Sequence, residues 1–117
     1  MAARGDEVTI HDKLVRDRIP EIIAAHGEVP EVRVLAADRV FPALVAKLHE
    51  EADELASAGP DDLLGELADV REVLAALTAL AGFTEEQVAA AARKRAERGG
   101  FDKRLWLDAV RRQLPPT

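Results

Sequence analysis

The chain has 117 residues, the length of one domain, and its apolar fraction of 48% includes only 3% aromatic residues. It contains no cysteine, which excludes disulfides, thiolate metal sites and thiol catalysis. The net charge of −6 argues against binding a nucleic-acid polymer, but not against a single nucleotide bridged by a metal ion. No apolar run is long enough for a membrane span, and residues 1–7 lack the apolar core of a signal peptide, so we expect a cytoplasmic protein.

The amino-terminal part predicts a loose tail followed by a first helix. The tail covers residues 1–10. The helix is expected over about 14–26, with Pro20 in its first turns and Gly27 at its end. Residues 28–37 then form an extended connector, whose valines permit a short strand.

Two long helices occupy the centre of the chain. The first is expected over about 38–57 with Asp38 as its N-cap, and an Ala-Gly-Pro sequence breaks it. The second, which Asp61 or Asp62 caps, extends to about residue 81. Alanine and leucine dominate both segments and are strong helix formers.

The carboxyl-terminal part predicts two further helices. Thr84 and Gln87 form a capping box for a helix over about 85–98, which a Gly-Gly pair ends. The apolar residues of 105–114 favour a short last helix. Together the elements predict an all-α fold, an antiparallel bundle of four to five helices.

Five acidic residues of the long helices lie along or near apolar stripes. At 100° per residue, Glu51 falls on the edge of the first stripe, with Glu54 and then Glu50 further round the same flank. On the second helix Glu66 falls inside the stripe and Asp69 at its edge. Acidic side chains are rarely buried without a partner, because an unpaired buried charge is costly.

These acids are also spaced symmetrically about the turn between the helices. Glu54 and Glu66 are each six residues from Pro60, and Glu51 and Asp69 are each nine residues from it. In an antiparallel hairpin such pairs lie at the same height, so the four carboxylates should converge. A hard divalent cation would relieve their repulsion, and Mg²⁺, with Mn²⁺ as a substitute, suits carboxylate oxygens.

The metal-site hypothesis excludes two nearby acids and has one alternative. Asp53 and Glu72 are equally acidic and close by, but their helical angles point them away from the stripes. The alternative reading is that Glu51 or Glu66 pairs with a nearby arginine, such as Arg71.

The acidic pattern EExxE, turn, ExxD resembles the all-α nucleoside triphosphate pyrophosphohydrolases of the MazG-like superfamily, which includes the phosphoribosyl-ATP pyrophosphohydrolases. Lys13–Ile23 (KLVRDRIPEII) is similar to the KLVRDKIPEII opening of a small single-domain branch, with Arg18 where lysine is usual. Lys94–Lys103 (KRAERGGFDK) is similar to that branch's KRxERGGFxK ending, with Asp102 in place of the commoner glutamate. The resemblance places the domain at 11–107 and leaves 108–117 as a carboxyl-terminal extension.

The resemblance implies hydrolysis between the α- and β-phosphates of a nucleotide, which yields a nucleoside monophosphate and pyrophosphate. By position, the Mg²⁺ ligands would be Glu51, Glu54, Glu66 and Asp69. Glu50 or Glu54 would position the attacking water or act as its base.

Basic residues would hold the leaving pyrophosphate. The candidates are Lys94, Arg95 and Arg98, with Lys13 and Arg16 as further ones, and Gly99 and Gly100 could offer backbone N–H groups. A plain helix cap at the glycines remains open, as does a surface or dimer salt bridge for Lys13 and Arg16. For Trp106 and Phe101, base stacking competes with core packing or a dimer contact.

Apolar residues around most of the second long helix predict burial on more than one side, and hence a homo-oligomer, a dimer or a dimer of dimers, that completes the bundle. Three functions remain: hydrolysis of canonical or damaged nucleoside triphosphates, the same chemistry on a dedicated metabolite such as phosphoribosyl-ATP, and a non-catalytic helical module that binds a partner protein. The acids along the apolar stripes disfavour the module.

Overall fold

The computed structural model describes residues 7–116, and across this range the regular elements are four α-helices and one 3-10 helix, without any strand. The predicted all-α class is therefore confirmed. The prediction that residues 28–37 could include a short strand is wrong. Val32 and Val34 are exposed and lie in irregular backbone. The predicted tail over 1–10 lies largely outside the described residues.

The chain divides into two compact units, Met1–Phe83 and Thr84–Thr117. The predicted domain limits at 11–107 and 108–117 stay predictions. None of the helices within the described range is both long and apolar enough to cross a bilayer.

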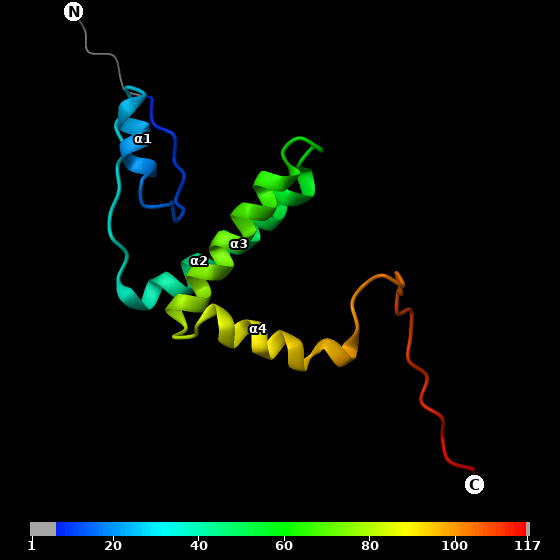
Figure 1. The fold of residues 1–117 in the computed structure, drawn as a ribbon. Coiled ribbons are helices and arrows are strands. Elements are labelled where there is room, and N and C mark those ends of the chain that lie inside the picture. Colours follow the sequence, from blue (N-terminus) through cyan, green and yellow to red (C-terminus); the bar gives the residue numbers. More distant parts are fainter. Residues whose placement is uncertain (1–6, 117) are drawn as a thin grey trace, which may run out of the picture. The chain divides into compact units, whose positions relative to one another are not determined.

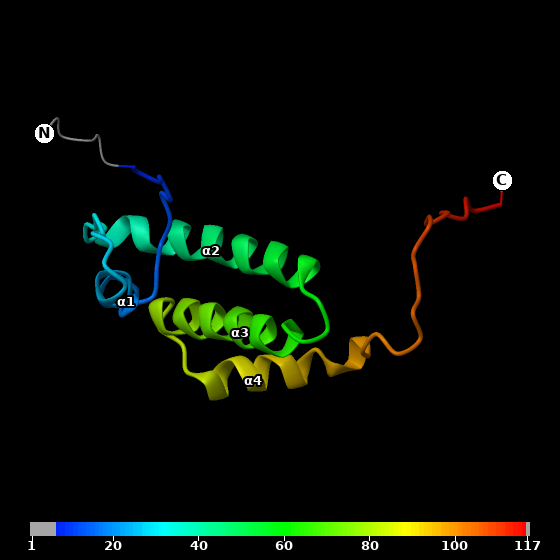
Figure 2. The same ribbon diagram turned by 90° about the horizontal axis from the view of Figure 1, so that it is seen from above.

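An antiparallel helical hairpin forms the centre of the first unit. Helices α2 (Ala37–Ser57) and α3 (Leu63–Leu80) pack side by side along their length, joined by a turn that contains Gly59 and Pro60 (Figures 1 and 2). Both predicted long helices are confirmed to within two residues, except that Ala36, and not Asp38, takes the N-cap position of α2. The convergence of the acids was predicted on the condition that the two helices run antiparallel from this turn, and they do.

Helix α1 (Ile19–Ala25) is shorter than predicted. It begins five residues later than expected, and Pro20 lies in its first turn, where the missing N–H of a proline costs no helical hydrogen bond. Its predicted end is confirmed, since Gly27 adopts a φ of 84° just after the helix. Residues 12–18, which we call the N-terminal segment, therefore have irregular backbone and not a helix.

In the second unit, α4 (Glu85–Lys94) starts at the predicted capping box. The Thr84 hydroxyl accepts from the Gln87 N–H, and the Gln87 side chain accepts from the Thr84 N–H. The helix ends four residues early and continues as a 3-10 turn, η1 (Ala96–Arg98). The predicted helix over 105–114 is wrong: its large apolar side chains are exposed, and so short a helix is unstable without packing.

The buried interior is small. Leu44 of α2 and Val73 of α3 are its buried apolar side chains among the described residues, and Glu51 is buried with them. Large side chains on α3 remain about half exposed, including Leu63 at 44%, Leu67 at 49% and Leu74 at 47%. Within the first unit, the hairpin thus buries the Val73 side of α3 against α2 and leaves a second apolar side uncovered.

Candidate metal centre

Three carboxylates from the two long helices meet inside the hairpin. Glu51 of α2 and Glu66 and Asp69 of α3 each offer an oxygen, and these oxygens all lie within 4.8 Å of one another. They converge because α2 and α3 run antiparallel and Glu51 and Asp69 are equally far from the turn. Three of the four predicted metal ligands are therefore brought together.

The buried oxygens of this cluster are incompletely satisfied. Glu51 Oε2 and Glu66 Oε2 are inaccessible to solvent and have no hydrogen-bond partner among the described residues. Leaving a buried acceptor unsatisfied costs about 1–3 kcal/mol, and more when it is charged. Such a cost is removed if a cation binds between the oxygens, and an all-oxygen set of ligands suits Mg²⁺ or Mn²⁺ better than a thiophilic metal.

Glu54, the fourth predicted ligand, lies outside this group of three. It is exposed on α2, one turn beyond Glu51. Burial raises the pKa of Glu51, and the neighbouring Glu54 carboxyl raises it further, by hydrogen bonding and by repulsion, whereas Lys47 opposes the shift. Glu54 is thus close enough to affect Glu51 electrostatically, and its role as a ligand stays a prediction.

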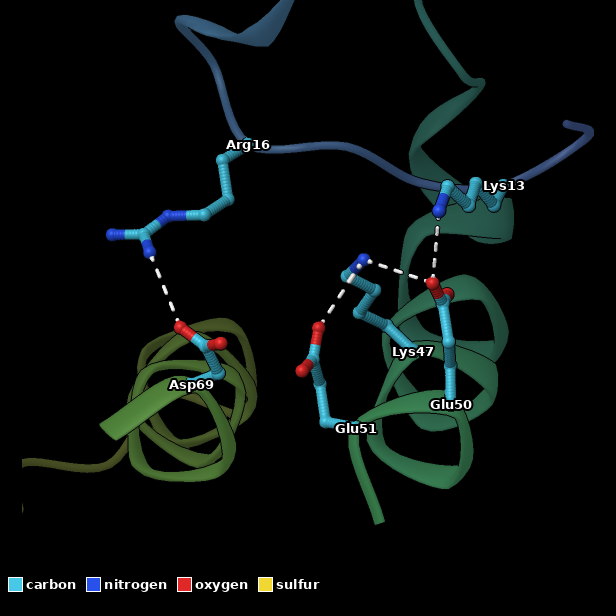
Figure 3. A network of polar contacts seen from close by, with 6 residues as sticks. All are labelled: Lys13, Arg16, Lys47, Glu50, Glu51 and Asp69. Carbon is cyan, nitrogen blue, oxygen red and sulfur yellow. Dashed lines mark hydrogen bonds and ion pairs between the residues drawn. The ribbon is translucent and has the colours of Figure 1, made fainter. Parts of the chain in front are cut away.

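Lys47 is the residue of this site that sequence reasoning missed. Its ammonium lies 3.3 Å from Glu51 Oε1 and 3.5 Å from Glu50 Oε1, and its side chain is only 15% exposed. The signal was present in the sequence, because a lysine three and four residues before two glutamates can pair with both on a helix. Figure 3 shows its ammonium between the two carboxylates.

The N-terminal segment brings two more cations to acids of the two long helices. Lys13 Nζ donates to Glu50 Oε1 at 3.0 Å, and Arg16 lies 3.7 Å from Asp69 Oδ1 (Figure 3). Arg16 also lies 3.8 Å from Glu72 Oε1. The segment therefore crosses from the flank of α2 to the flank of α3. Both residues were predicted to bind phosphate, and in this structure both pair with acids, as the salt-bridge alternative expected.

Glu50 is held by lysines and does not belong to the carboxylate cluster. Burial acts to raise its pKa, but hydrogen bonds and charge from Lys13 and Lys47 outweigh that effect, so the pKa of Glu50 is lowered. A carboxylate with a lowered pKa is a weaker proton acceptor. Its geometry suits anchoring the N-terminal segment to α2.

A pocket of about 170 Å³ opens between the N-terminal segment and the two helices. Its polar lining consists of two acids of the cluster, Glu51 and Asp69, and three cations, Lys13, Arg16 and Lys47. Val15 and Ile19 complete the wall. Acids that can hold a metal ion and cations that can hold phosphate thus share one pocket.

The other predicted phosphate contacts lie in the second unit. Lys94, Arg95 and Arg98 are exposed at the end of α4 and in η1, and their approach to the acids stays a prediction. Gly99 ends η1 with a φ of 76°, and its N–H donates to Ala96 O at 2.9 Å. The cap alternative therefore accounts for Gly99, and phosphate binding by Gly99 and Gly100 stays a prediction. Phe101 and Trp106 are exposed.

Comparison with known proteins finds a relative that matches part of the chain. An uncharacterized protein of Mycolicibacterium smegmatis is 52% identical over 50 residues, a stretch that covers 43% of this chain and 51% of that protein. The match thus spans about half the length of the relative. No family model matches the chain, and no solved structure matches it.

Proposed function

We propose that this chain is a magnesium-dependent nucleotide pyrophosphohydrolase that cleaves a nucleoside triphosphate between its α- and β-phosphates. The products would be a nucleoside monophosphate and pyrophosphate. The observation that carries the proposal is the pair of buried oxygens, Glu51 Oε2 and Glu66 Oε2, which lack partners within residues 7–116 and lie beside Asp69. A cation bound between these oxygens would remove the cost of leaving them buried and unpaired.

The residues at the mouth of the pocket support a phosphate ligand. Glu51, Glu66 and Asp69 would hold the metal ion, and Lys13 and Arg16 would contact the phosphates from the N-terminal segment. When bound, a divalent cation neutralises phosphate charge and lowers the pKa of a coordinated water. Cations and metal ligands in one pocket are the combination that a metal–polyphosphate complex requires.

Of the two predicted bases, Glu54 fits the role better than Glu50. Its carboxylate is exposed and adjacent to Glu51, so it can accept a proton from a water at the metal ligands without losing an ion pair. Glu50 already accepts from Lys13 and lies 3.5 Å from the Lys47 ammonium. We propose that Glu54 takes the proton of the attacking water and that Glu50 positions Lys13.

We further propose that the bundle is completed by a homo-oligomer, at least a dimer, in the cytoplasm. The uncovered side of α3, with Leu63, Leu67 and Leu74 about half exposed, is the surface that a second copy would bury.

The experiment is a pyrophosphate-release assay over ribonucleoside and deoxyribonucleoside triphosphates and phosphoribosyl-ATP, with Mg²⁺. Glu51→Gln and Asp69→Asn should each lower the rate by at least about a hundred-fold, because each removes a charged metal ligand. Asp53→Asn, on the solvent side of α2, is the matched control and should keep full activity. Release of phosphate and a nucleoside diphosphate would contradict the proposed bond cleavage. Selective use of phosphoribosyl-ATP would identify a dedicated substrate.

A further inference from the structure

Lys47 has an unusual environment for a lysine. Its side chain is 15% exposed, and among the described residues its ammonium forms ion pairs with the carboxylates of Glu50 and Glu51. Lysine is almost never buried unless it is paired. Here the pairing partner, Glu51, is also a member of the three-carboxylate cluster.

The ammonium therefore competes with a metal ion for the same carboxylate. Lys47 lies 3.3 Å from Glu51 Oε1, whereas the other oxygen of Glu51 faces the cluster without a hydrogen-bond partner in the described part of the chain. A divalent cation bound to Glu51 would lie close to the ammonium, and like charges at such a distance repel. Binding of a metal ion to Glu51 should therefore weaken the Lys47–Glu51 ion pair, and this ion pair should weaken metal binding.

The pocket offers the displaced ammonium a second partner. Lys47 lines the same 170 Å³ pocket as Lys13 and Arg16, and it approaches that pocket from α2 while they approach from the N-terminal segment. Once its acid is neutralised, an ammonium in this position can pair with an anion in the pocket. Three cations around one anion fit a diphosphate group, which carries several negative charges.

We propose that Lys47 is an exchangeable counter-ion that couples metal binding to diphosphate binding. In the metal-free protein it neutralises Glu51. When a divalent cation binds Glu51, the ammonium of Lys47 is released and pairs with the diphosphate portion of the ligand. This inference rests on the proposed function, because it assumes that the cluster binds a metal ion and the pocket a phosphate chain.

Binding thermodynamics test the proposal without an activity assay. Isothermal titration calorimetry would measure Mn²⁺ alone, inorganic pyrophosphate alone, and pyrophosphate in the presence of Mn²⁺, for the wild type and Lys47→Met. Lys47→Arg keeps the charge, and Arg39→Met removes an exposed charge from the same helix as the matched control. Circular dichroism in EDTA would verify that each variant is folded.

The expected result has two parts. Lys47→Met should bind Mn²⁺ alone about ten-fold more tightly, because the competing charge is gone. The factor by which Mn²⁺ strengthens pyrophosphate binding should fall by about ten-fold, because the released cation is missing. Arg39→Met should match the wild type, and Lys47→Arg should keep most of the coupling. Weaker Mn²⁺ binding by a folded Lys47→Met, or unchanged coupling, would overturn the proposal.

A measurement on the wild type covers the case in which Lys47→Met does not fold. The lysine side-chain NMR signals, assigned with Lys47→Arg, should show a shift of Lys47 on adding Mg²⁺ and a further shift on adding pyrophosphate. Unmoved Lys47 signals at saturating Mg²⁺ would overturn the proposal.

The two hypotheses fail in different ways. A wild type that binds Mn²⁺ and pyrophosphate with the expected coupling but hydrolyses no nucleotide contradicts the proposed function and leaves the role of Lys47 standing. An active wild type whose Lys47→Met variant binds both ligands unchanged contradicts the role of Lys47 alone. Absence of Mn²⁺ binding to the wild type contradicts both.

Discussion

Glu51 and Glu66 come from different helices and offer oxygens within 4.8 Å of each other, and each has one buried carboxylate oxygen without a hydrogen-bond partner within the described residues. Burial of unpaired carboxylate oxygens opposes folding, and the hairpin has few buried apolar side chains to offset it. A protein with this arrangement should depend on a cation for part of its stability.

Divalent metal should therefore stabilise the fold. Adding millimolar Mg²⁺ or Mn²⁺ to EDTA-treated protein should raise the thermal midpoint, because a ligand that binds only the native state shifts the equilibrium by about 2.7 kcal/mol at a hundred times its Kd. Asp69→Asn should lose most of this metal-dependent rise, and Asp53→Asn should retain it. Differential scanning fluorimetry is the measurement, and an equal rise in all three proteins would contradict the metal site.

Removing the buried charge should stabilise the metal-free protein. Since burial and then Glu54 raise the pKa of Glu51, its ionisation opposes folding, and stability is lost as the pH rises through the folded-state pKa. Glu51→Gln in EDTA should melt above the wild type at pH 7, and this difference should narrow as the pH is lowered through the raised pKa of Glu51. A lower midpoint for Glu51→Gln would mean that the Lys47–Glu51 ion pair outweighs the burial.

The part of the site that could be predicted from the sequence is the set of acids whose positions follow from helical geometry. Equal spacing of Glu51 and Asp69 from the turn, with Glu66 inside the apolar stripe, correctly brought three acids together. Arg16 pairs with Asp69 through the path of the N-terminal segment, which no periodicity encodes. The same helical geometry could have identified Lys47, but a lysine four residues from a glutamate, as Lys47 is from Glu51, is typical of an ordinary interaction on a helix surface.

In the fold, too, the features that depend on adjacent residues could be predicted, and those that depend on distant packing partners could not. Local chemistry determined the capping box of Thr84 and Gln87 and the end of α1 at Gly27, because each depends on a few adjacent residues. The predicted helix over 105–114 depends on packing partners, and its exposed side chains have none in the part of the chain that the structure describes. The start of α1 was predicted five residues too early, and Pro20 lies in the first turn of the helix, a position that suits a proline.

Glu50 and Glu54 should differ in their kinetic roles. Glu54→Gln should lower kcat by about a hundred-fold or more if it accepts the proton of water, since general-base catalysis contributes roughly 10² to 10⁴. Glu50→Gln should mainly raise KM, because it frees Lys13 from α2 and loosens the N-terminal segment. Steady-state kinetics on both variants separates these effects. The reverse pattern would assign the base to Glu50.

The uncovered side of α3 should be an interface between copies. Light scattering should give the mass of at least a dimer, and Leu67→Glu should shift it toward the monomer, because a charge on this apolar side opposes burial. Asp61→Lys, in the exposed turn after α2, is the control and should keep the wild-type mass. A monomeric wild type would contradict the proposed assembly.

The most direct test of the metal centre is the binding of Mn²⁺, followed by electron paramagnetic resonance, to the wild type, Glu66→Gln and Asp53→Asn. Glu66→Gln removes one charge from the three-carboxylate cluster, and Asp53→Asn removes one charge from the solvent side of the same hairpin. We expect saturable binding to the wild type and Asp53→Asn, and at least about ten-fold weaker binding to Glu66→Gln. Equal affinity in all three proteins would contradict a metal site formed by Glu51, Glu66 and Asp69.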